Sequence, residues 1–319
     1  MLQLMQKYMP GFSGKPVSYR NYHAYRTADR LYVIIPARTD QDSYYELAAI
    51  TAYLQEAGFP RLAQPMLTTE GQILTVYENT AYLVVEMPPP YTRDLQAHGA
   101  ELASFHQLGA SCPFAPDTLS SYGKWGDLWT ARLSQAEKLY AEMYQKRPLV
   151  HEERVFLDTF YYVIGRTELA IQYLNETNDE FRFTESDQPT TVFMKYRSEL
   201  ADTYVLPHTI VYDHPARDLA EYTRNSFFNE EMNEAAEFLR SYMQVRPLSV
   251  FGMRLLYARL IMPLHLFDQM EKGLAGTAGK EYEKLIMQQS VYEQRLAGLF
   301  QYMQVDPQVL EIPLLENFL

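Results

Sequence analysis

The stretch that decides the fold lies between residues 22 and 36 and reads YHAYRTADRLYVIIP. Its two halves, residues 22–27 and 31–35, are rich in tyrosine, valine and isoleucine, which favour pleated strands. The polar corner Ala-Asp-Arg at residues 28–30 separates them. This pattern predicts an antiparallel hairpin.

A second hairpin is predicted further along the chain from residues 72–77 and 81–86, two alternating or apolar runs separated by a polar turn. Between the two hairpins, apolar residues recur at a helical period. That segment predicts one helix, which Asp42 or Ser43 caps and which ends before Gly58. The predicted order is strand, strand, helix, strand, strand.

A proline-rich connector, Met-Pro-Pro-Pro at residues 87–90, follows the second hairpin. Three prolines remove three backbone donors and hold the segment extended, so we expect a boundary between residues 1–88 and residues 89–319. Beyond it, helical periodicity dominates, interrupted by β-branched and aromatic runs at residues 190–194 and 203–212 that predict a small sheet. The predicted helices span residues 94–108, 125–145, 152–174, 218–226 and 230–244, with further stretches between residues 250 and 310.

Composition excludes several classes of protein. The 319 residues include 40 Asp and Glu against 28 Lys and Arg, a net charge of −12 that repels phosphate backbones. The single cysteine, Cys112, makes neither an internal disulfide nor a cysteine metal cluster. No apolar stretch approaches eighteen residues, and residues 1–10 are too short and too polar for a signal peptide. We therefore expect a soluble globular protein with no nucleic-acid partner, no structural zinc, no membrane span and no secretion signal.

Three motifs carry a family resemblance. Residues 101–108, ELASFHQL, resemble the helix that opens the large lobe of aminoglycoside-phosphotransferase-like kinases, and residues 218–220, Asp-Leu-Ala, resemble a later motif of that family. Residues 212–224, YDHPARDLAEYTR, are more similar to CotS- and YutH-type spore coat proteins, and that likeness extends along the chain. The resemblance implies an α+β, bilobal protein-kinase-like fold, with a small antiparallel-sheet lobe containing one helix and a larger, mainly helical lobe.

The catalytic loop of such a kinase is missing. An active enzyme needs an aspartate in a His-x-Asp loop and a phosphate-pairing lysine on a small-lobe strand. None of the seven histidines has Asp two positions later, and residues 31–36 contain no lysine. Aligned with the family, the catalytic histidine and aspartate fall on Met194 and Tyr196, and a metal-binding asparagine falls near Ala201. A base and a metal ligand are thus both lost.

Two carboxylates are candidate remnants of a cofactor site. Glu46 lies where the family's glutamate pairs with the missing lysine, and without that lysine we expect a solvated or capping role. The metal-binding aspartate position falls either on Thr209, the placement that we favour, or on Asp213. Asp213 has a further interpretation as a local partner of Arg217.

We expect three residues to have structural roles. In related kinases the residue that matches Asp218 accepts backbone hydrogen bonds from the catalytic loop, and a carboxylate at a helix start is also favoured by the helix dipole. Arg217, which precedes it, is a possible local ion-pair partner of Asp213. His106 lies beside Leu102 and Phe105, which predicts a buried, hydrogen-bonded helix residue. We assign no catalytic residue and no metal ligand.

The resemblance implies a noncatalytic, pseudokinase-like spore coat protein that acts in coat formation, needs no cofactor and binds other coat proteins. It also implies synthesis in the mother-cell cytoplasm and recruitment to the spore coat. Two alternatives stay open. One is an active small-molecule phosphotransferase that uses ATP and Mg with Asp213 as a metal ligand. The other is a noncatalytic regulator that binds nucleotide near Glu86 and Met87.

Overall fold

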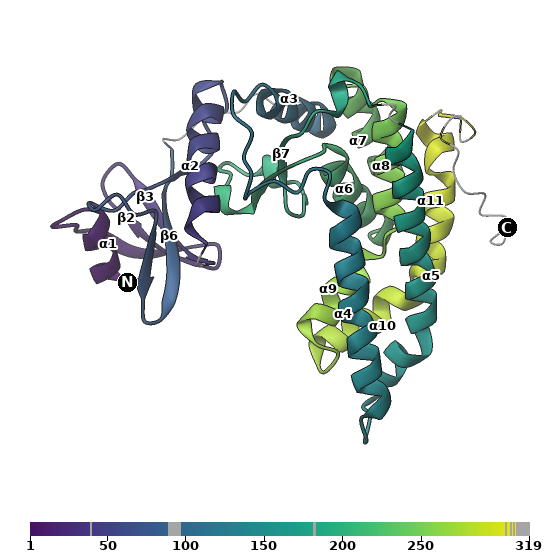
Figure 1. Ribbon diagram of the computed structural model, residues 1–319. Coiled ribbons are helices and arrows are strands. Elements are labelled where there is room, and N and C mark those ends of the chain that lie inside the picture. The colour runs from purple at the N-terminus through teal and green to yellow at the C-terminus, as the bar shows by residue number, and fades with distance from the viewer. Residues whose placement is uncertain are drawn as a thin grey trace. The chain divides into compact units, whose positions relative to one another are not determined.

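The computed structural model describes residues 1–38, 40–88, 97–180, 183–303, 305–306, 308 and 310. The chain divides into two compact units, and each is built from two separate stretches of sequence (Figure 1). The first unit comprises Met1–Ser121 and Pro189–Asp213, and the second comprises Tyr122–Gln188 and His214–Leu319.

The first unit contains an antiparallel sheet. Its order is β1-β2-β3-β6-β4, and β5 also pairs with β6. The strands are β1 Lys15–Tyr19, β2 Tyr22–Arg26, β3 Leu31–Ala37, β4 Gln64–Pro65, β5 Leu74–Tyr77 and β6 Thr80–Glu86. The predicted hairpin of residues 22–35 is the β2–β3 pair, in which Tyr25 lies opposite Tyr32. The second predicted hairpin is the β5–β6 pair.

Both faces of this sheet are buried. Val33 and Ile35 belong to one apolar cluster, whereas Tyr32 and Ile34 belong to a second cluster on the opposite face. The helix α1 (Leu2–Tyr8) covers the second cluster with Leu4, Met5 and Tyr8. Neither α1 nor β1 is predicted from the sequence, so the expectation of one small-lobe helix was wrong. A run that is apolar at successive positions requires a cover on each face, which is why α1 is needed.

The predicted small-lobe helix is α2 (Gln41–Glu56). Leu47, Ile50 and Leu54 are buried at the expected helical spacing. The N-cap is Asp40, whose side chain accepts a hydrogen bond from the backbone N–H of Asp42, so the predicted cap at Asp42 or Ser43 was wrong. The helix begins at Gln41, six residues before Leu47, the first residue of the apolar period.

The rest of the first unit surrounds a short hairpin of β7 (Thr190–Phe193) and β8 (Ile210–Asp213). The expected strand at residues 203–212 is therefore confirmed only at its end. The helix α3 (His98–Ala110) packs against β7 at Gly109, where an added Cβ would lie 2.1 Å from Oγ1 of Thr191. Two 3₁₀ helices, η2 (Glu199–Ala201) and η3 (Pro207–Thr209), connect the strands.

The second unit is mainly helical. Its elements are α4 Trp125–Gln145, α5 His151–Asp179, η1 Glu185–Asp187, α6 Ala216–Phe228, α7 Met232–Val245, α8 Val250–Ile261, α9 Leu264–Lys272, α10 Thr277–Met287 and α11 Gln289–Met303. α4 and α5 run side by side (Figure 1). At the start of α4, the rings of Trp125 and Trp129 stack with centroids 5.7 Å apart.

An antiparallel-sheet part followed by a larger helical part confirms the predicted fold class. Residues 125–145 form a helix with the predicted bounds, and α5 extends the predicted helix of residues 152–174 at both ends. Residues 89–96, which include Pro89 and Pro90 and the predicted helix start at residue 94, lie outside the described residues. The lobe boundary at residue 88 stays a prediction.

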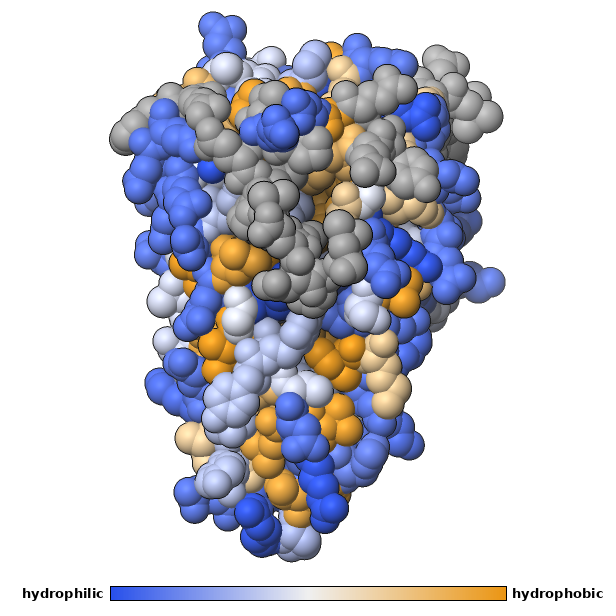
Figure 2. Space-filling view, turned by 90° about the vertical axis from the view of Figure 1, so that its right-hand side faces the viewer, coloured by the Kyte–Doolittle hydropathy of each residue, from blue (hydrophilic) through white to orange (hydrophobic). Residues whose placement is uncertain are grey.

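Within the described ranges, no single helix has both the length and the apolar composition to cross a membrane. The combination that meets both criteria joins α8 and α9, which are bent by 43° at a short break. Figure 2 shows one face of the molecule, on which hydrophilic residues predominate and apolar residues form separate patches.

Candidate functional site

Tyr196, which the sequence alignment places at the catalytic-aspartate position, is a core residue. Tyr196, three residues after β7, is fully buried. Its hydroxyl group lies 2.5 Å from Nε2 of His98 in α3, and its ring packs against Phe193 with centroids 5.2 Å apart. Met194, at the histidine position, is partly exposed, and its backbone N–H donates to the carbonyl of Thr209. This segment contributes to packing and offers no carboxylate.

The strand β3, where the phosphate-pairing lysine is expected, supplies no cation. Arg30 lies just before the strand and forms an ion pair with Glu86, with Nη1 3.1 Å from Oε1. Glu86 is opposite Tyr32 in the sheet, so this pair lies at the end of the β3–β6 ladder. Arg30 is therefore paired with a carboxylate of the neighbouring strand β6.

Glu46, on α2, forms its hydrogen bonds with a loop and not with a lysine. Its Oε1 accepts hydrogen bonds from the backbone N–H groups of Asp117 and Thr118, at 3.0 and 3.2 Å. Its Oε2 accepts a third from the N–H of Leu119, at 2.8 Å. A carboxylate that accepts several backbone N–H bonds forms strong, charge-assisted contacts. In this structure Glu46 thus accepts backbone hydrogen bonds, and its assignment as a remnant of a cofactor site stays a prediction.

Asp213 reaches the same loop from the other side. It ends β8, is fully buried, and its Oδ2 accepts a hydrogen bond of 2.7 Å from the hydroxyl of Ser121. The backbone of the loop also pairs with β8, since the N–H of Ser121 donates to the carbonyl of Tyr212 and the N–H of Tyr212 donates to the carbonyl of Leu119. We call residues 117–121 the clamped loop. Both candidate cofactor remnants thus bind the clamped loop.

Thr209, the favoured alternative for the metal position, lies at the end of η3. Its hydroxyl donates to the carbonyl of Leu206 at 3.2 Å, a local bond typical of a threonine in a turn. A hydroxyl does not replace a carboxylate as a magnesium ligand in a kinase site. Neither placement of the metal position therefore yields a set of ligands around one point.

The three residues with expected structural roles lie in helices. His106 is fully buried in α3, and its backbone carbonyl accepts a 2.6 Å hydrogen bond from the hydroxyl of Thr190. Asp218 is fully buried in the first turn of α6, and Arg217 precedes it with a half-buried side chain. Burial would raise the pKa of Glu221, which also lies in α6. The charges of nearby arginines, Arg217 among them, outweigh burial and lower that pKa to about 2. The contact of Asp218 with the former catalytic loop stays a prediction.

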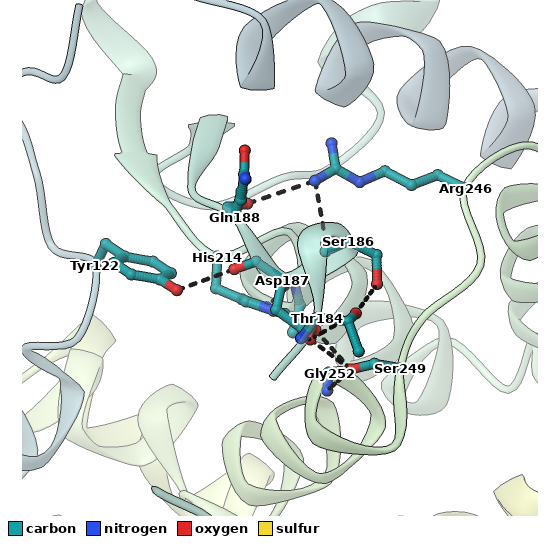
Figure 3. Close-up of polar contacts among 10 residues, drawn as sticks. Tyr122, Thr184, Ser186, Asp187, Gln188, His214, Arg246, Ser249 and Gly252 are labelled. Atoms are coloured by element: carbon teal, nitrogen blue, oxygen red, sulfur yellow. Dashed lines mark hydrogen bonds and ion pairs between the residues drawn. The ribbon is translucent and has the colours of Figure 1, made fainter. Parts of the chain in front are cut away.

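A second polar centre, not predicted from the sequence, lies in the second unit around Asp187 (Figure 3). Asp187 ends η1 and is 1% exposed. Its carboxylate accepts hydrogen bonds from the hydroxyl of Ser249 at 2.6 and 2.7 Å, and from the backbone N–H of Thr184 at 2.6 Å. The backbone carbonyl of Asp187 accepts a further bond from the hydroxyl of Tyr122 at 3.0 Å.

His214, just before α6, completes this centre. Its Nδ1 accepts a 3.0 Å hydrogen bond from the backbone N–H of Ala216, which leaves the ring proton on Nε2. Nε2 therefore donates to Oδ1 of Asp187 across 3.3 Å. Gly252 makes the approach possible, since a Cβ there would lie 2.9 Å from the same oxygen. Burial alone would raise the pKa of Asp187, but the hydrogen bonds from His214, Ser249 and Thr184 outweigh it and lower that pKa.

Serine, histidine and aspartate meet at this centre, but not as a nucleophile with its base. A catalytic triad requires the imidazole to accept the serine proton. Here both nitrogens of His214 have other partners, and the hydroxyl of Ser249 donates to Asp187 while it accepts from the N–H of Gly252. Ser249 is the N-cap of α8, so the centre joins the starts of two helices to η1. The arrangement is structural.

Two local signals could have found this centre. Thr184 and Asp187 form a capping box, the pattern in which a threonine is followed three residues later by an acidic residue. Ser249 precedes an apolar helical run, as an N-cap residue does. Neither signal reveals that the two caps meet.

The residues at the kinase positions do not fit a magnesium–ATP complex. β3 has no lysine, the carboxylate of Glu46 is engaged by three backbone donors, and Tyr196 lies in the core. Among the residues that the structure describes, no three His, Cys, Asp or Glu side chains come together in a way that could hold a metal ion. We derive no phosphoryl-transfer step.

Comparison with solved structures shows that the fold is kinase-like. The aminoglycoside phosphotransferase from Alicyclobacillus acidocaldarius is similar with a TM-score of 0.66 and 15% identity, over 95% of this chain and 96% of that one. Spectinomycin phosphotransferase in its AMP-bound complex is similar with a TM-score of 0.61 and 12% identity, over 93% and 98% of the two chains. These likenesses show the fold alone.

Sequence comparison then shows the family. The chain belongs to the family described as spore coat putative kinase YutH, whose model matches residues 4–304. It is 30% identical over 305 residues to the endospore coat-associated protein YutH of Bacillus subtilis (strain 168), across 92% of this chain and 90% of that protein. The predicted family and the kinase-like fold are confirmed.

Proposed function

We propose that this chain is a noncatalytic, kinase-like protein of the endospore coat and that it acts in coat formation. Its family and its relative from Bacillus subtilis support a place in the coat. With that location we propose other coat proteins as its partners, and synthesis in the mother-cell cytoplasm before recruitment to the forming spore.

The observation that carries the noncatalytic proposal is the engagement of both remnant carboxylates by the clamped loop. Glu46 accepts three backbone hydrogen bonds from it, and Asp213 accepts one from Ser121. Catalysis of phosphoryl transfer depends on charges that are positioned on the phosphates and on their metal ions. Carboxylates that bind backbone and side-chain donors of their own unit are committed to the fold.

The burial of Tyr196 supports the same proposal. A base must face the substrate hydroxyl from a site that substrate reaches. The side chain of Tyr196 is fully buried between α3 and β7, with its hydroxyl at His98. Replacing it by aspartate would bury a carboxylate in an apolar environment and would not create a base at a substrate site.

The test combines calorimetric titration of the full chain with ATP and magnesium and a transfer assay on the same sample, with small amino alcohols as acceptors. We expect no phosphoryl transfer. Magnesium-dependent transfer that Asp213→Asn abolishes would overturn the proposal in favour of an active phosphotransferase. Saturable ATP binding without turnover would instead favour a nucleotide-binding regulator.

A cellular test addresses the coat. In an endospore-forming bacterium that lacks its own relative of this chain, the wild-type protein and Asp213→Asn should support coat assembly equally, because an amide still accepts the hydrogen bond from Ser121. A coat defect with Asp213→Asn, when that variant accumulates and folds normally, would contradict a noncatalytic role.

A further inference from the structure

A cavity of about 250 Å³ lies within the first unit, between the β1–β2 turn and the segment of residues 199–209. Its lining is mixed, with charged, aromatic and aliphatic side chains. The lining residues are Arg20, Asn21, Tyr22, Glu199, Asp202, Tyr204, Val205, Leu206, His208 and Thr209. A volume of this size suits a small ligand of a few non-hydrogen atoms.

Two of the three charged side chains neutralise each other. Nη2 of Arg20 lies 2.5 Å from Oδ2 of Asp202, and both side chains are partly exposed. Arg20 is the only lysine or arginine among the lining residues. The cation that a phosphate group would need is therefore already paired with a carboxylate.

Glu199 is the remaining charge. It begins η2, and its Oε2 accepts a 2.6 Å hydrogen bond from the backbone N–H of Arg197. Within the described part of the chain, no lysine, arginine or histidine side chain forms an ion pair with it. Burial raises the pKa of Glu199, and the nearby charge of Asp202 also raises it. The backbone N–H and the positive charge of Arg197 act in the opposite direction, but burial is the largest effect and the net shift is upward.

His208 does not supply that partner. Its Nε2 lies 3.0 Å from the hydroxyl of Tyr22. Burial, together with the positive charge of Arg20, lowers the pKa of His208 to about 4. The ring is therefore neutral at pH 7, and the lining carries a net negative charge.

We propose that this cavity binds a small organic ammonium ion, with the carboxylate of Glu199 as its counter-charge and the rings of Tyr22 and Tyr204 as aromatic walls. Aromatic faces attract ammonium groups, and the attraction is larger where the site is partly dehydrated. The net charge of the cavity lining is negative, whereas a phosphate ligand requires a positively charged lining. The proposal rests on the lining of the cavity and holds whether or not the chain is catalytic.

The test is calorimetric titration of the full chain with tetramethylammonium chloride, with sodium chloride at equal ionic strength as the blank and sodium pyrophosphate as the anionic competitor. We expect saturable binding of tetramethylammonium and none of pyrophosphate. Pyrophosphate binding that Arg20→Gln abolishes, or no heat from tetramethylammonium at millimolar concentration, would overturn the proposal.

Charge-changing variants should move the affinity in opposite directions. Glu199→Gln should weaken binding by about tenfold or more, because it removes the counter-charge and keeps the shape. Arg20→Gln should strengthen binding, because it removes the repelling cation. The matched control is Glu185→Gln, an exposed residue that also begins a 3₁₀ helix. Equal affinities of wild type and Glu199→Gln for tetramethylammonium would contradict the proposal.

The affinity of the wild-type chain for tetramethylammonium, measured as a function of pH, tests the role of Glu199 without any substitution. It therefore remains informative when a variant fails to fold. Tetramethylammonium keeps its charge at every pH, so any change in affinity reports the protein. Binding should weaken as acid protonates Glu199, starting above the ordinary glutamate range because its pKa is raised. An affinity that stays constant through this range would contradict the role of Glu199.

Discussion

The first unit places Glu46 and Asp213 at positions where the family resemblance expects cofactor ligands, whereas the second unit places Asp187 where no family motif marks a site. Glu46 is half-buried and accepts three backbone hydrogen bonds from the clamped loop. Asp187 is fully buried and accepts hydrogen bonds from backbone, hydroxyl and imidazole donors.

The comparison teaches that the donors around a carboxylate, and its burial, decide its role more than its position in a motif does. A buried carboxylate is stable only when its lone pairs are satisfied. Asp187 meets that condition with donors from three segments, so its loss should affect the whole second unit. Glu46 joins one helix to one loop, so its loss should act locally.

The largest effect is expected for Asp187→Ala. It leaves the donors of Ser249, Thr184 and His214 without their acceptor inside the protein. Breaking a buried network of this kind costs about 3–5 kcal/mol. Denaturant unfolding followed by tryptophan fluorescence measures it directly, because Trp125 and Trp129 both lie in the second unit. Glu185→Ala, two residues away and exposed, is the control and should change little.

The same centre predicts a pH dependence. The pKa of Asp187 is lower in the folded chain than in the unfolded chain, so acid protonates the unfolded chain first. The stabilisation is complete above the unfolded pKa of about 4 and is lost as the pH falls through the folded pKa. Asp187→Asn should remove this part of the acid sensitivity. Identical acid unfolding curves for wild type and Asp187→Asn would contradict it.

A smaller, local effect is expected for Glu46→Gln. The amide keeps one acceptor oxygen but loses the charge that three backbone donors share, which costs roughly 1–3 kcal/mol. Amide hydrogen exchange should become faster at Asp117, Thr118 and Leu119, whose N–H groups bind Glu46. Glu56→Gln, at the exposed end of the same helix, should leave those rates unchanged. Unchanged exchange in Glu46→Gln would mean that the clamped loop does not depend on this carboxylate.

The smallest effect is expected for Tyr196→Phe. It removes the hydroxyl at His98 and keeps the ring that packs on Phe193. The loss should be about 1 kcal/mol, the net value of one hydrogen bond. Thermal unfolding monitored by circular dichroism compares it with Tyr53→Phe, a half-buried tyrosine of α2 whose hydroxyl makes no hydrogen bond within the described residues. Higher stability of Tyr196→Phe than of the wild type would contradict this and show that the buried hydroxyl destabilises the core.

For Glu46 the sequence indicates a type of role but not the partner. The sequence predicted a solvated or capping role for Glu46, because its strand partner lysine is missing. It did not predict that the clamped loop is what Glu46 holds, since 71 residues separate it from Asp117. Asp187 and Ser249 each carry a local capping signal, but their meeting across 62 residues has no sequence pattern.

The sequence by itself determined the two hairpins with a helix between them, the absence of a His-x-Asp loop and of a strand lysine, and the family. Periodicity, turn residues and missing residue types are local properties, so they need no contacts. Only the tertiary structure decided that α1 covers the sheet, that the clamped loop joins Glu46 to Asp213, and that Glu199 shares a cavity with Tyr22. Contacts between residues far apart in sequence arise from packing and from the need to satisfy each buried polar group, and neither has a local pattern.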